Sequence, residues 1–535
     1  MTFIQAALCG LIYWGYATQT PGWTVLPMFY YPLPASLWVG IILGDIPTAV
    51  MCGAAIQLTV MGFSGAGGTV PNDKSAACIV PTAAVITSGM GMDMAIALSV
   101  PVGLLMAQLH TIRRMVDNIY LHMCDKYAND SVINRGKFIF AAVILPQIGK
   151  LVIFWLPMTL LLYYGASNAS VVLDKIPSWI TNGFSGAGKF LPALGMGITI
   201  SYIGKRELLP FFFAGFFLTQ YTHVDSIFLV MIAAMLAWLY TKFEKANYVQ
   251  EEVDDSSFAS NKEKQTVLTK KDLFKSYFWW VIGSEASISY ERFEATGFTL
   301  SMLPALEKLY PNDQEAIRAG VKRHLQFFNT EQFWGSMIPG IALSMEEQKA
   351  LGADIPDDAI TSIKTGLMGP FAGIGDTIDW ATIVPLILCF FIPFGQKGYW
   401  WGAALPMIII PIIFFVEGWF FFKRGYYLGT DAALQLMGGG MMTQVLNFMS
   451  IVGLTMVGGL SASYVDITTP LAIKSGEKVI EIQSGILDAI VPGILPLVAV
   501  MGVYFLLKSN NKALTRAMLV LIAVGFICGA LGIIA

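Results

Sequence analysis

The stretch Gly369–Trp380 (GPFAGIGDTIDW) places two carboxylates, Asp376 and Asp379, in an otherwise apolar part of the chain. An ionised side chain within an apolar span is costly, and such residues usually mark a solute pathway or a ligand contact. Three glycines and one proline in GPFAGIG disfavour a regular helix. Irregular backbone inside a membrane persists only where protein buries it or water reaches it. We therefore predict a broken element that binds a polar solute, with Trp380 beside the acids. A tight surface turn with solvated acids is the alternative.

A second group of polar residues lies in the first half of the chain. Gln57 sits in an apolar run, and Asp73 and Lys74 follow a glycine-rich loop. Amide and carboxylate groups suit a sugar, whose hydroxyls both donate and accept hydrogen bonds. We predict that Gln57 and Asp73 contact such a ligand. The alternatives are a Gln57 bonded to a neighbouring backbone carbonyl, and a solvated ion pair between Asp73 and Lys74.

The composition identifies the environment in which these residues act. The chain has 535 residues, 55% of them hydrophobic and 13% charged, with a mean hydropathy of +0.63. These values are typical of a membrane protein with many crossings, embedded in a lipid bilayer. The net charge of -3 provides no basic surface for nucleic acid. Six scattered cysteines and four distant histidines suggest neither a disulfide framework nor a metal site.

The segment Gly183–Lys189 approaches the phosphate-loop pattern, in which backbone amides surround a phosphate group. Phe190 stands where that pattern requires serine or threonine, and no convincing strand precedes the glycines. We therefore expect no bound nucleotide, and no other cofactor is indicated.

Apolar runs are distributed along both halves of the chain, and several are shorter than the roughly 20 residues that cross a bilayer as a helix. We predict an all-α polytopic membrane protein with two transmembrane domains and broken or re-entrant helices. Basic residues concentrate in loops on the cytoplasmic side of membranes. Arg113, Arg114, Arg135 and Lys137 therefore predict an internal loop, which places both chain termini outside.

Residues 242–272 are highly charged, mixed in sign and poor in large apolar side chains, as in a solvated linker. We predict a transmembrane domain over 1–241, a charged cytoplasmic linker over 242–272 and a second domain over 273–535. In this second domain, amphipathic helices over 273–362 are expected to precede a transmembrane part over 363–535.

The hexapeptide GFSGAG occurs twice, at 62–67 and at 183–188. Internal repeats beside short apolar segments are typical of transporters, and the interruptions point to the binding site. Chance recurrence in a glycine-rich chain is the alternative.

Long motifs in both halves resemble one family, the mannose/fructose/sorbose-type bacterial phosphotransferase system. Residues 273–535 resemble its enzyme IID through YERFEATGFTLSMLPALEKLYP (290–311), RHLQFFNTEQF (323–333), SIKTGLMGPFAGIGDTIDW (362–380) and LMGGG (436–440). Residues 1–241 resemble its enzyme IIC through VGIILGDIPTAVMCGAAIQLTVMGFSGAGGTVPNDKSA (39–76) and NGFSGAGKFLPALGMG (182–197). The chain thus looks like a fusion of IIC and IID.

This resemblance implies a group translocator in the bacterial inner membrane. IIC and IID would bind and pass the sugar, while soluble IIA and IIB proteins carry the phosphoryl group and IIB phosphorylates the arriving sugar. The chain itself shows no catalytic phosphotransfer residues. The resemblance also implies a homotrimer, with the sugar held where IIC meets IID by Gln57, Asn72 and Asp73 on one side and Asp376 on the other.

The sequence departs from the family pattern at several of these positions. Gln57 stands where many relatives have the glutamate of a GGTLE motif, and Tyr30-Tyr31-Pro32-Leu33 replaces a His-Arg-Pro-Leu segment. Asp379 is an acid that the common GDPIFW form lacks. Polar changes in a binding site shift selectivity strongly, so the resemblance does not name the sugar, whether a hexose or an amino sugar. An ion-coupled secondary sugar transporter, with Asp376 and Asp379 holding the coupling ion, is the alternative function.

Overall fold

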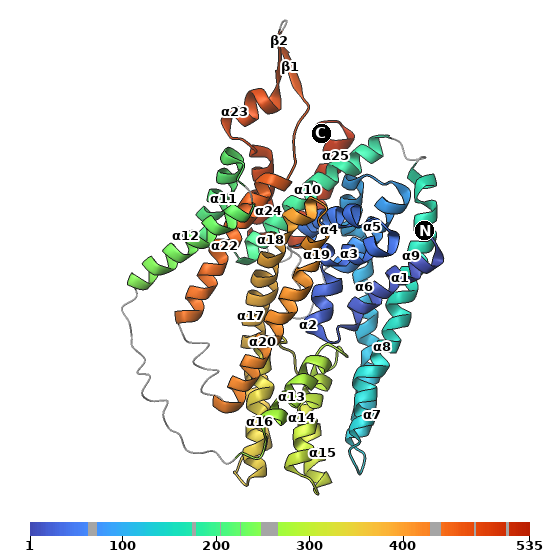
Figure 1. Cartoon of the computed structure of the whole chain (residues 1–535), viewed down its shortest axis with the longest axis vertical. Helices are drawn as coiled ribbons and strands as arrows, with labels where there is room; N and C mark the ends of the chain where they lie inside the picture. Colours follow the sequence, from blue (N-terminus) through green and yellow to red (C-terminus); the bar gives the residue numbers. More distant parts are fainter. Residues whose placement is uncertain are drawn as a thin grey trace.

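The computed structural model describes residues 1–61, 72–173, 178–203, 205–224, 226–247, 266–428, 440–475, 478–509 and 513–534. These residues form an elongated bundle of helices (Figure 1), as the sequence predicted. We call residues 1–247 the first half and residues 266–534 the second half. The first copy of GFSGAG, at 62–67, and most of the predicted linker lie outside the described residues.

The described residues of the first half form α-helices, three π-helical turns (η1, η3, η4) and one 3-10 turn (η5). In order these are α1 Phe3–Thr18, α2 Gly22–Val25, η1 Leu26–Tyr30, α3 Pro32–Leu43, α4 Ile46–Val60, α5 Lys74–Ser88, α6 Met92–Ala128, α7 Arg135–Ile139, η3 Phe140–Ile144, α8 Leu145–Lys150, η4 Leu151–Trp155, α9 Leu156–Leu173, α10 Ser178–Ile203, η5 Arg206–Leu208, α11 Leu209–Thr222 and α12 Ser226–Asn247.

The second half adds a short antiparallel hairpin that the sequence did not predict. Its elements are α13 Lys270–Gly283, α14 Ala295–Leu309, α15 Gln314–His324, η7 Trp334–Ser336, α16 Met337–Ala350, α17 Asp357–Gly375, η8 Asp376–Ile383, α18 Val384–Gln396, α19 Trp400–Ala404, α20 Pro406–Leu428, α22 Gly440–Tyr464, β1 Ala472–Ser475, β2 Lys478–Glu481, η9 Gln483–Leu487, α23 Asp488–Ile490, α24 Ile494–Ser509 and α25 Ala513–Ala530.

Four helical segments among the described residues are long and apolar enough to cross a membrane: Met92–Ala128, Arg135–Gly165, Asp357–Gln396 and Trp400–Tyr427. The pair Gln483–Ile490 and Ile494–Lys508, bent by 57°, provides a fifth if it forms one broken span. Shorter apolar helices such as α3, α4 and α5 accompany them. The protein is therefore a multi-pass membrane protein with broken helices.

The backbone of Gly369–Trp380 differs from the prediction. Helix α17 runs through Pro370 to Gly375, continues directly into the π-helical turn η8, and so forms part of one segment of 40 residues. No irregular loop interrupts it. In a bilayer the backbone must satisfy its own hydrogen bonds, and this requirement outweighs the weak helix preference of glycine and the single bond lost at proline. The helix accommodates this sequence by changing to the wider π-helical turn η8, which begins at Asp376.

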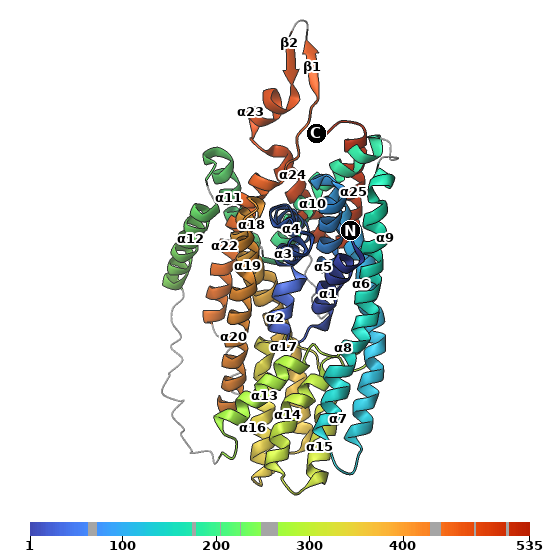
Figure 2. The ribbon, with the colours of Figure 1, turned by 45° about the vertical axis from the view of Figure 1, so that its right-hand side comes forward.

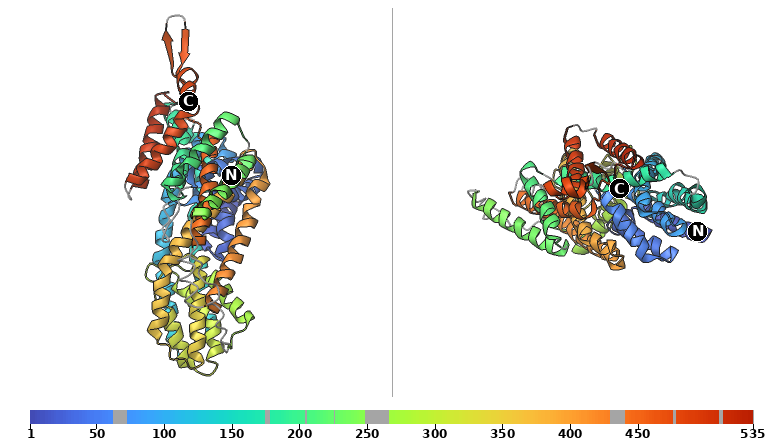
Figure 3. Two further views of the ribbon diagram at one scale, coloured as in Figure 1. Left: turned by 90° about the vertical axis from the view of Figure 1, so that its left-hand side faces the viewer. Right: turned by 90° about the horizontal axis from the view of Figure 1, so that it is seen from above.

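The two ends of the bundle differ in character (Figures 1 and 2). Helices α13 to α16 gather at one end with α7, while the hairpin β1–β2 projects from the other. The side view in Figure 3 shows the hairpin as the outermost feature of the molecule. Arg135 and Lys137 belong to α7, so positive-inside reasoning predicts that the end with α13 to α16 faces the cytoplasm.

The two halves interleave. Helix α25 packs against α10, α22 against α11, and α18 against α4, so helices from opposite ends of the chain are neighbours. The largest apolar cluster accordingly includes Leu58 and Phe212 of the first half together with Cys389 and Val503 of the second. This shared core brings polar residues from both halves to one junction.

Candidate binding site at the junction of the halves

Asp73 is the N-terminal cap of α5 and is completely buried. Its Oδ1 accepts a hydrogen bond of 2.9 Å from the backbone N–H of Ala76. Its Oδ2 accepts one of 2.7 Å from the Tyr13 hydroxyl and lies 3.0 Å from Nε2 of His110. Asp73 and Lys74 therefore do not form a solvated ion pair, because helix capping and tertiary contacts hold the carboxylate inside the protein.

A line of four tyrosine rings leads away from Asp73. Tyr13 and Tyr16 have ring centres 6.1 Å apart, Tyr16 stacks on Tyr30 at 5.1 Å, and Tyr30 lies 5.0 Å from Tyr31. Tyr31 is buried in a small apolar cluster with Phe333 of the second half. The rings thus connect the buried acid of the first half with the second half.

Asp379 lies in the second half beyond these rings and is also completely buried. Its Oδ1 accepts a hydrogen bond of 3.1 Å from the indole Nε1 of Trp334. The carboxyl group of Glu417 lies close to that of Asp379, and two carboxyl groups so near to each other repel when both are ionised. Trp380 packs beside this pair, with its ring 5.1 Å from that of Phe414.

Trp380 contacts apolar clusters that include residues of both halves, so it lies at the junction. Asp376 lies one turn earlier in the same helix and is only partly buried. It interacts electrostatically with Glu285, Glu294 and Glu331. The second half therefore contributes a group of acids to the junction, of which the sequence motif showed only two.

Gln57 and Asn72 are buried in the first half. Oε1 of Gln57 accepts a hydrogen bond of 3.4 Å from the backbone N–H of Leu33, while Nε2 has no partner among the described residues. Nδ2 of Asn72 donates to the Val100 carbonyl at 3.2 Å, and its Oδ1 has no such partner and packs against Gly103. Each of these two amide groups therefore has one polar atom that makes no hydrogen bond to any described residue.

The second copy of GFSGAG lies within helix α10. Gly186 approaches Gly525 and Gly529 of α25 so closely that a Cβ atom would overlap them. This copy therefore packs the two halves together and is not an interruption beside the candidate site. The first copy, at 62–67, lies outside the described residues.

Lys150 is a junction residue that the sequence analysis missed. It lies within the membrane-spanning segment Arg135–Gly165 and is buried. Its ammonium donates to the carbonyl of Thr18 at 3.0 Å and to that of Ala286 at 2.8 Å. The sequence could have indicated Lys150, because an ionisable residue within an apolar run is rare and usually has a function.

Further contacts across the junction surround Lys150. Nε of Arg113 lies 3.9 Å from Oδ2 of Asp117, which also accepts a hydrogen bond of 3.1 Å from the backbone N–H of Ile288. The guanidinium of Arg114 lies 5.6 Å from the ring centre of Tyr290. These residues bind α6 of the first half to the loop that follows α13.

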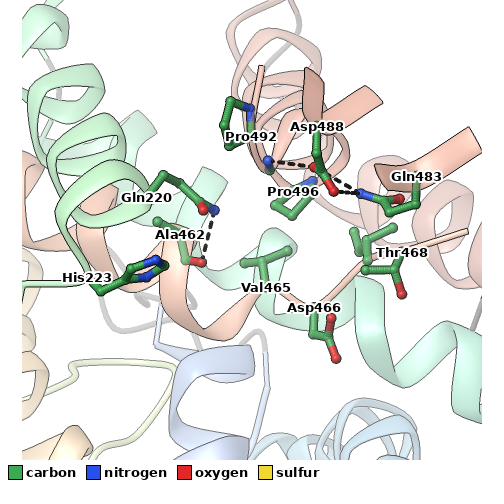
Figure 4. A pocket seen from close by; sticks show the side chains of 12 residues that line it. Gln220, His223, Ala462, Val465, Asp466, Thr468, Gln483, Asp488, Pro492 and Pro496 are labelled. Carbon is green, nitrogen blue, oxygen red and sulfur yellow. Dashed lines mark hydrogen bonds between the residues drawn. The ribbon is translucent and has the colours of Figure 1, made fainter. Parts of the chain in front are cut away.

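A pocket of about 400 Å³ lies elsewhere, near the hairpin (Figure 4). Gln483 donates hydrogen bonds of 3.1 Å to both oxygens of Asp488, whose Oδ1 also accepts from the backbone N–H of Gly493 at 3.2 Å. The residues that line this pocket include none of the six predicted site residues, and its main polar groups are bonded to one another. We therefore do not assign the predicted site to it.

The described residues include no group of three or more histidine, cysteine, aspartate or glutamate side chains that could hold a metal ion. The junction instead offers carboxyl, amide and hydroxyl groups beside aromatic rings. Such groups bind a polar organic solute by hydrogen bonding and stacking. The fold and the site together define a polytopic membrane protein whose two unlike halves present polar groups to one junction.

Comparison with known proteins identifies the family. Residues 3–239 match the family described as "PTS system sorbose-specific iic component", and residues 267–534 match "PTS system mannose/fructose/sorbose family IID component". The chain belongs to the mannose/fructose/sorbose family of the phosphotransferase system and joins a IIC and a IID component. It is a membrane component of sugar transport and works with a sugar and with IIA and IIB proteins.

Individual relatives match one half each. The mannose-specific EIID component of Escherichia coli K12 is 35% identical over 256 residues, which is 46% of this chain and 90% of the relative. The fructose permease IID component of Bacillus subtilis is 32% identical, covering 50% of this chain and 97% of the relative. The mannose-specific EIIC component of Escherichia coli K12 is 29% identical, covering 40% and 79%.

A solved chain from "CryoEM Structure of Mannose Transporter ManYZ and Microcin E492 (MceA) complex" is 32% identical to this chain. It covers 51% of this chain and 100% of its own length, with a TM-score of 0.30.

Proposed function

We propose that this chain binds one sugar at the junction of its halves and passes it across the bacterial inner membrane to a separate IIB protein, which phosphorylates it. The line of tyrosine rings between the buried carboxyls of Asp73 and Asp379 is the observation that supports this proposal. Aromatic rings stack on sugar rings, while flanking polar groups bind hydroxyls.

The substrate contacts in this proposal are Gln57, Asn72 and Asp73 of the first half, and Asp376, Asp379 and Trp380 of the second. Gln57 and Asn72 each have a polar atom for which the described residues provide no partner. A sugar hydroxyl bonded to each of these atoms would remove the cost of burying it unpaired. Asp379 acts partly by holding Trp334 beside the site.

The proposed organisation assigns 1–241 to the IIC domain, 242–272 to a cytoplasmic linker and 273–535 to the IID domain. Three copies of the chain form the transporter. Helices α13 to α16 lie at the end predicted to be cytoplasmic and provide a surface for IIB. Mass measurement of the purified chain in detergent tests the trimer directly, and a monomer would contradict it.

Direction comes from phosphorylation, since a sugar phosphate cannot return through a site built for the free sugar. Vesicles that contain the chain should accumulate sugar phosphate only when phosphoenolpyruvate and the soluble phosphotransferase proteins, including IIA and IIB, are present. Accumulation of unmodified sugar driven by a proton or sodium gradient would refute the proposal and support an ion-coupled transporter.

Two matched variants make this assay specific. Asp73→Asn removes one acceptor position from the buried cluster and should lower phosphorylation-linked uptake at least tenfold. Asp466→Asn makes the same chemical change at an exposed residue near the hairpin, at the opposite end from α13 to α16, and should leave uptake unchanged. Equal uptake by both variants would exclude Asp73 from the site.

A further inference from the structure

Lys74 is the first residue of α5, and only 4% of its surface is exposed. Its ammonium lies 5.3 Å from the ring centres of both Tyr30 and Tyr31. Its side chain makes no hydrogen bond and no ion pair with the residues that the structure describes. The faces of the two tyrosine rings are the groups that stabilise its charge. A cation gains from aromatic faces, but this gain is smaller than that of a direct partner.

Other buried lysines in this chain are bonded differently. Lys150 donates to two backbone carbonyls, as described above. Lys364 donates to the carbonyls of His324 at 2.9 Å and Gln326 at 3.3 Å. The fold therefore supplies acceptors to these two lysines and supplies none from the described residues to Lys74.

Asp73 and Asp379, two acids of the candidate site, form hydrogen bonds with groups other than Lys74. Both oxygens of Asp73 accept hydrogen bonds from other groups, and Oδ1 of Asp379 accepts one from Trp334. Neither acid forms an ion pair with Lys74. A buried ammonium without a counter-ion is unfavourable, so an anionic group brought by a ligand would be strongly stabilised there.

Two further features bear on this place. The N-terminal end of a helix repels a cation, and Lys74 lies at such an end, which the Asp73 carboxylate caps. Nε2 of Gln57 is a second donor without a partner among the described residues, and Gln57 holds the backbone of Leu33, two residues after Tyr31. Helices α3, α4 and α5, which carry these residues, pack side by side (Figure 2).

We propose that the transported sugar carries a carboxylate, as a hexuronate or a disaccharide containing a uronic acid does, and that Lys74 binds this carboxylate. The proposal rests on the proposed function and specifies its substrate class. In a hexuronate the C6 position is the carboxylate, so the phosphoryl group must be accepted by a hydroxyl at another carbon or on the second sugar.

Binding to the purified full chain tests this proposal without the phosphorylation step. Isothermal calorimetry should compare glucose with glucuronate and galactose with galacturonate, since the sugars of each pair differ only at C6. We expect each acid to bind at least about tenfold more tightly than its neutral counterpart, as a charged hydrogen bond provides. Lys74→Met should remove this preference, and Lys74→Arg should retain much of it. The exposed substitution Lys126→Met should leave it unchanged.

Equal or tighter binding of the neutral sugars by the unmodified chain would overturn the proposal, as would a preference that survives in Lys74→Met. If the methionine variant does not fold, the comparison of acid and neutral sugars on the unmodified chain still decides the test. Uptake of neutral sugars alone would overturn this inference and leave the proposed function intact. Failure of every sugar to bind or be taken up would overturn both.

Discussion

The ammonium of Lys150, in the first half of the chain, donates a hydrogen bond of 2.8 Å to the carbonyl oxygen of Ala286, in the second half. The same ammonium donates to the carbonyl of Thr18, so one buried side chain joins the last residue of α1 to the loop that follows α13. Lys150→Met keeps most of the apolar volume but leaves both carbonyls without this donor. We expect the free energy of unfolding to fall by about 2–4 kcal/mol.

Thermal unfolding of the detergent-solubilised chain, followed by tryptophan fluorescence, measures this effect. Lys126→Met makes the same chemical change at an exposed position of α6 and serves as the matched control. A Lys150→Met protein as stable as the control would show that the bridge between the halves contributes little.

The carboxyl groups of Asp379 and Glu417 lie close together in the interior. Asp379→Asn removes the repulsion between them, because the amide can donate to Glu417 while its oxygen still accepts from Trp334. We expect this variant to keep wild-type stability and to raise the KM for sugar by no more than about tenfold, since one charged hydrogen bond is altered. Asp379→Ala should lose about 1–3 kcal/mol of stability, because it leaves the indole N–H unpaired.

Uptake by phosphorylation and thermal unfolding should be measured on both variants. If uptake by the unmodified chain depended on a proton gradient and Asp379→Asn abolished that dependence, Asp379 would be a coupling site. If Asp379→Ala were as stable as Asp379→Asn, the hydrogen bonds of this carboxyl would not support the fold.

Gly215 of α11 faces the backbone of α22, and a Cβ atom there would overlap the carbonyl oxygen of Thr455. The two helices belong to different halves, and small residues allow such close helix packing in membranes. Gly215→Ala should therefore destabilise the protein by about 1–3 kcal/mol through overpacking. In α24, a Cβ atom on Gly502 would meet nothing within 4 Å, so Gly502→Ala should be neutral or stabilising.

Thermal unfolding of the two alanine variants provides the comparison. A loss of stability in both would point to a general cost of alanine in these helices, and equal stability in both would show that α11 and α22 separate easily.

Several features of the fold and the site could be predicted from the sequence. The hydropathy and the long motifs predicted the helical membrane fold and the family, because both depend on stretches of many residues. Asp73 was predicted as a polar group of interest, but its partners were not: Tyr13 and His110 lie 60 and 37 residues away in sequence and become neighbours only through tertiary packing.

Predictions made from neighbouring residues in the sequence were wrong where tertiary packing or the membrane determines the structure. The glycines and proline of Gly369–Trp380 predicted a loop, yet the backbone is helical because an apolar environment penalises unpaired peptide groups. The sequence around His324 is typical of a histidine on a helix surface, but His324 is completely buried, with Nε2 2.8 Å from Oε1 of Glu346. Only the packing of α15 against its neighbours makes this side chain part of the interior.

The buried His324 also predicts how stability changes with pH. It lies outside the candidate membrane spans, and burial lowers its pKa below the ordinary value of about 6.5, although the bond to Glu346 opposes this shift. The unfolded chain therefore binds more protons than the folded chain as the pH falls through about 6.5. The stability that the neutral imidazole provides is fully present above this pH. It decreases as the pH falls from there towards the lower pKa of the folded state. His324→Gln cannot titrate, and its amide can still donate to Glu346.

Unfolding temperatures measured from pH 7.5 to 5.5 should therefore fall less in His324→Gln than in the unmodified chain. His223→Asn alters an exposed histidine whose backbone φ of +50° asparagine tolerates, and it should keep the pH dependence of the unmodified chain. Because His324→Gln and the unmodified chain differ in no other titrating group, the difference between their slopes isolates His324. Identical slopes in all three would mean that the imidazole is protonated to the same extent in the folded and unfolded states.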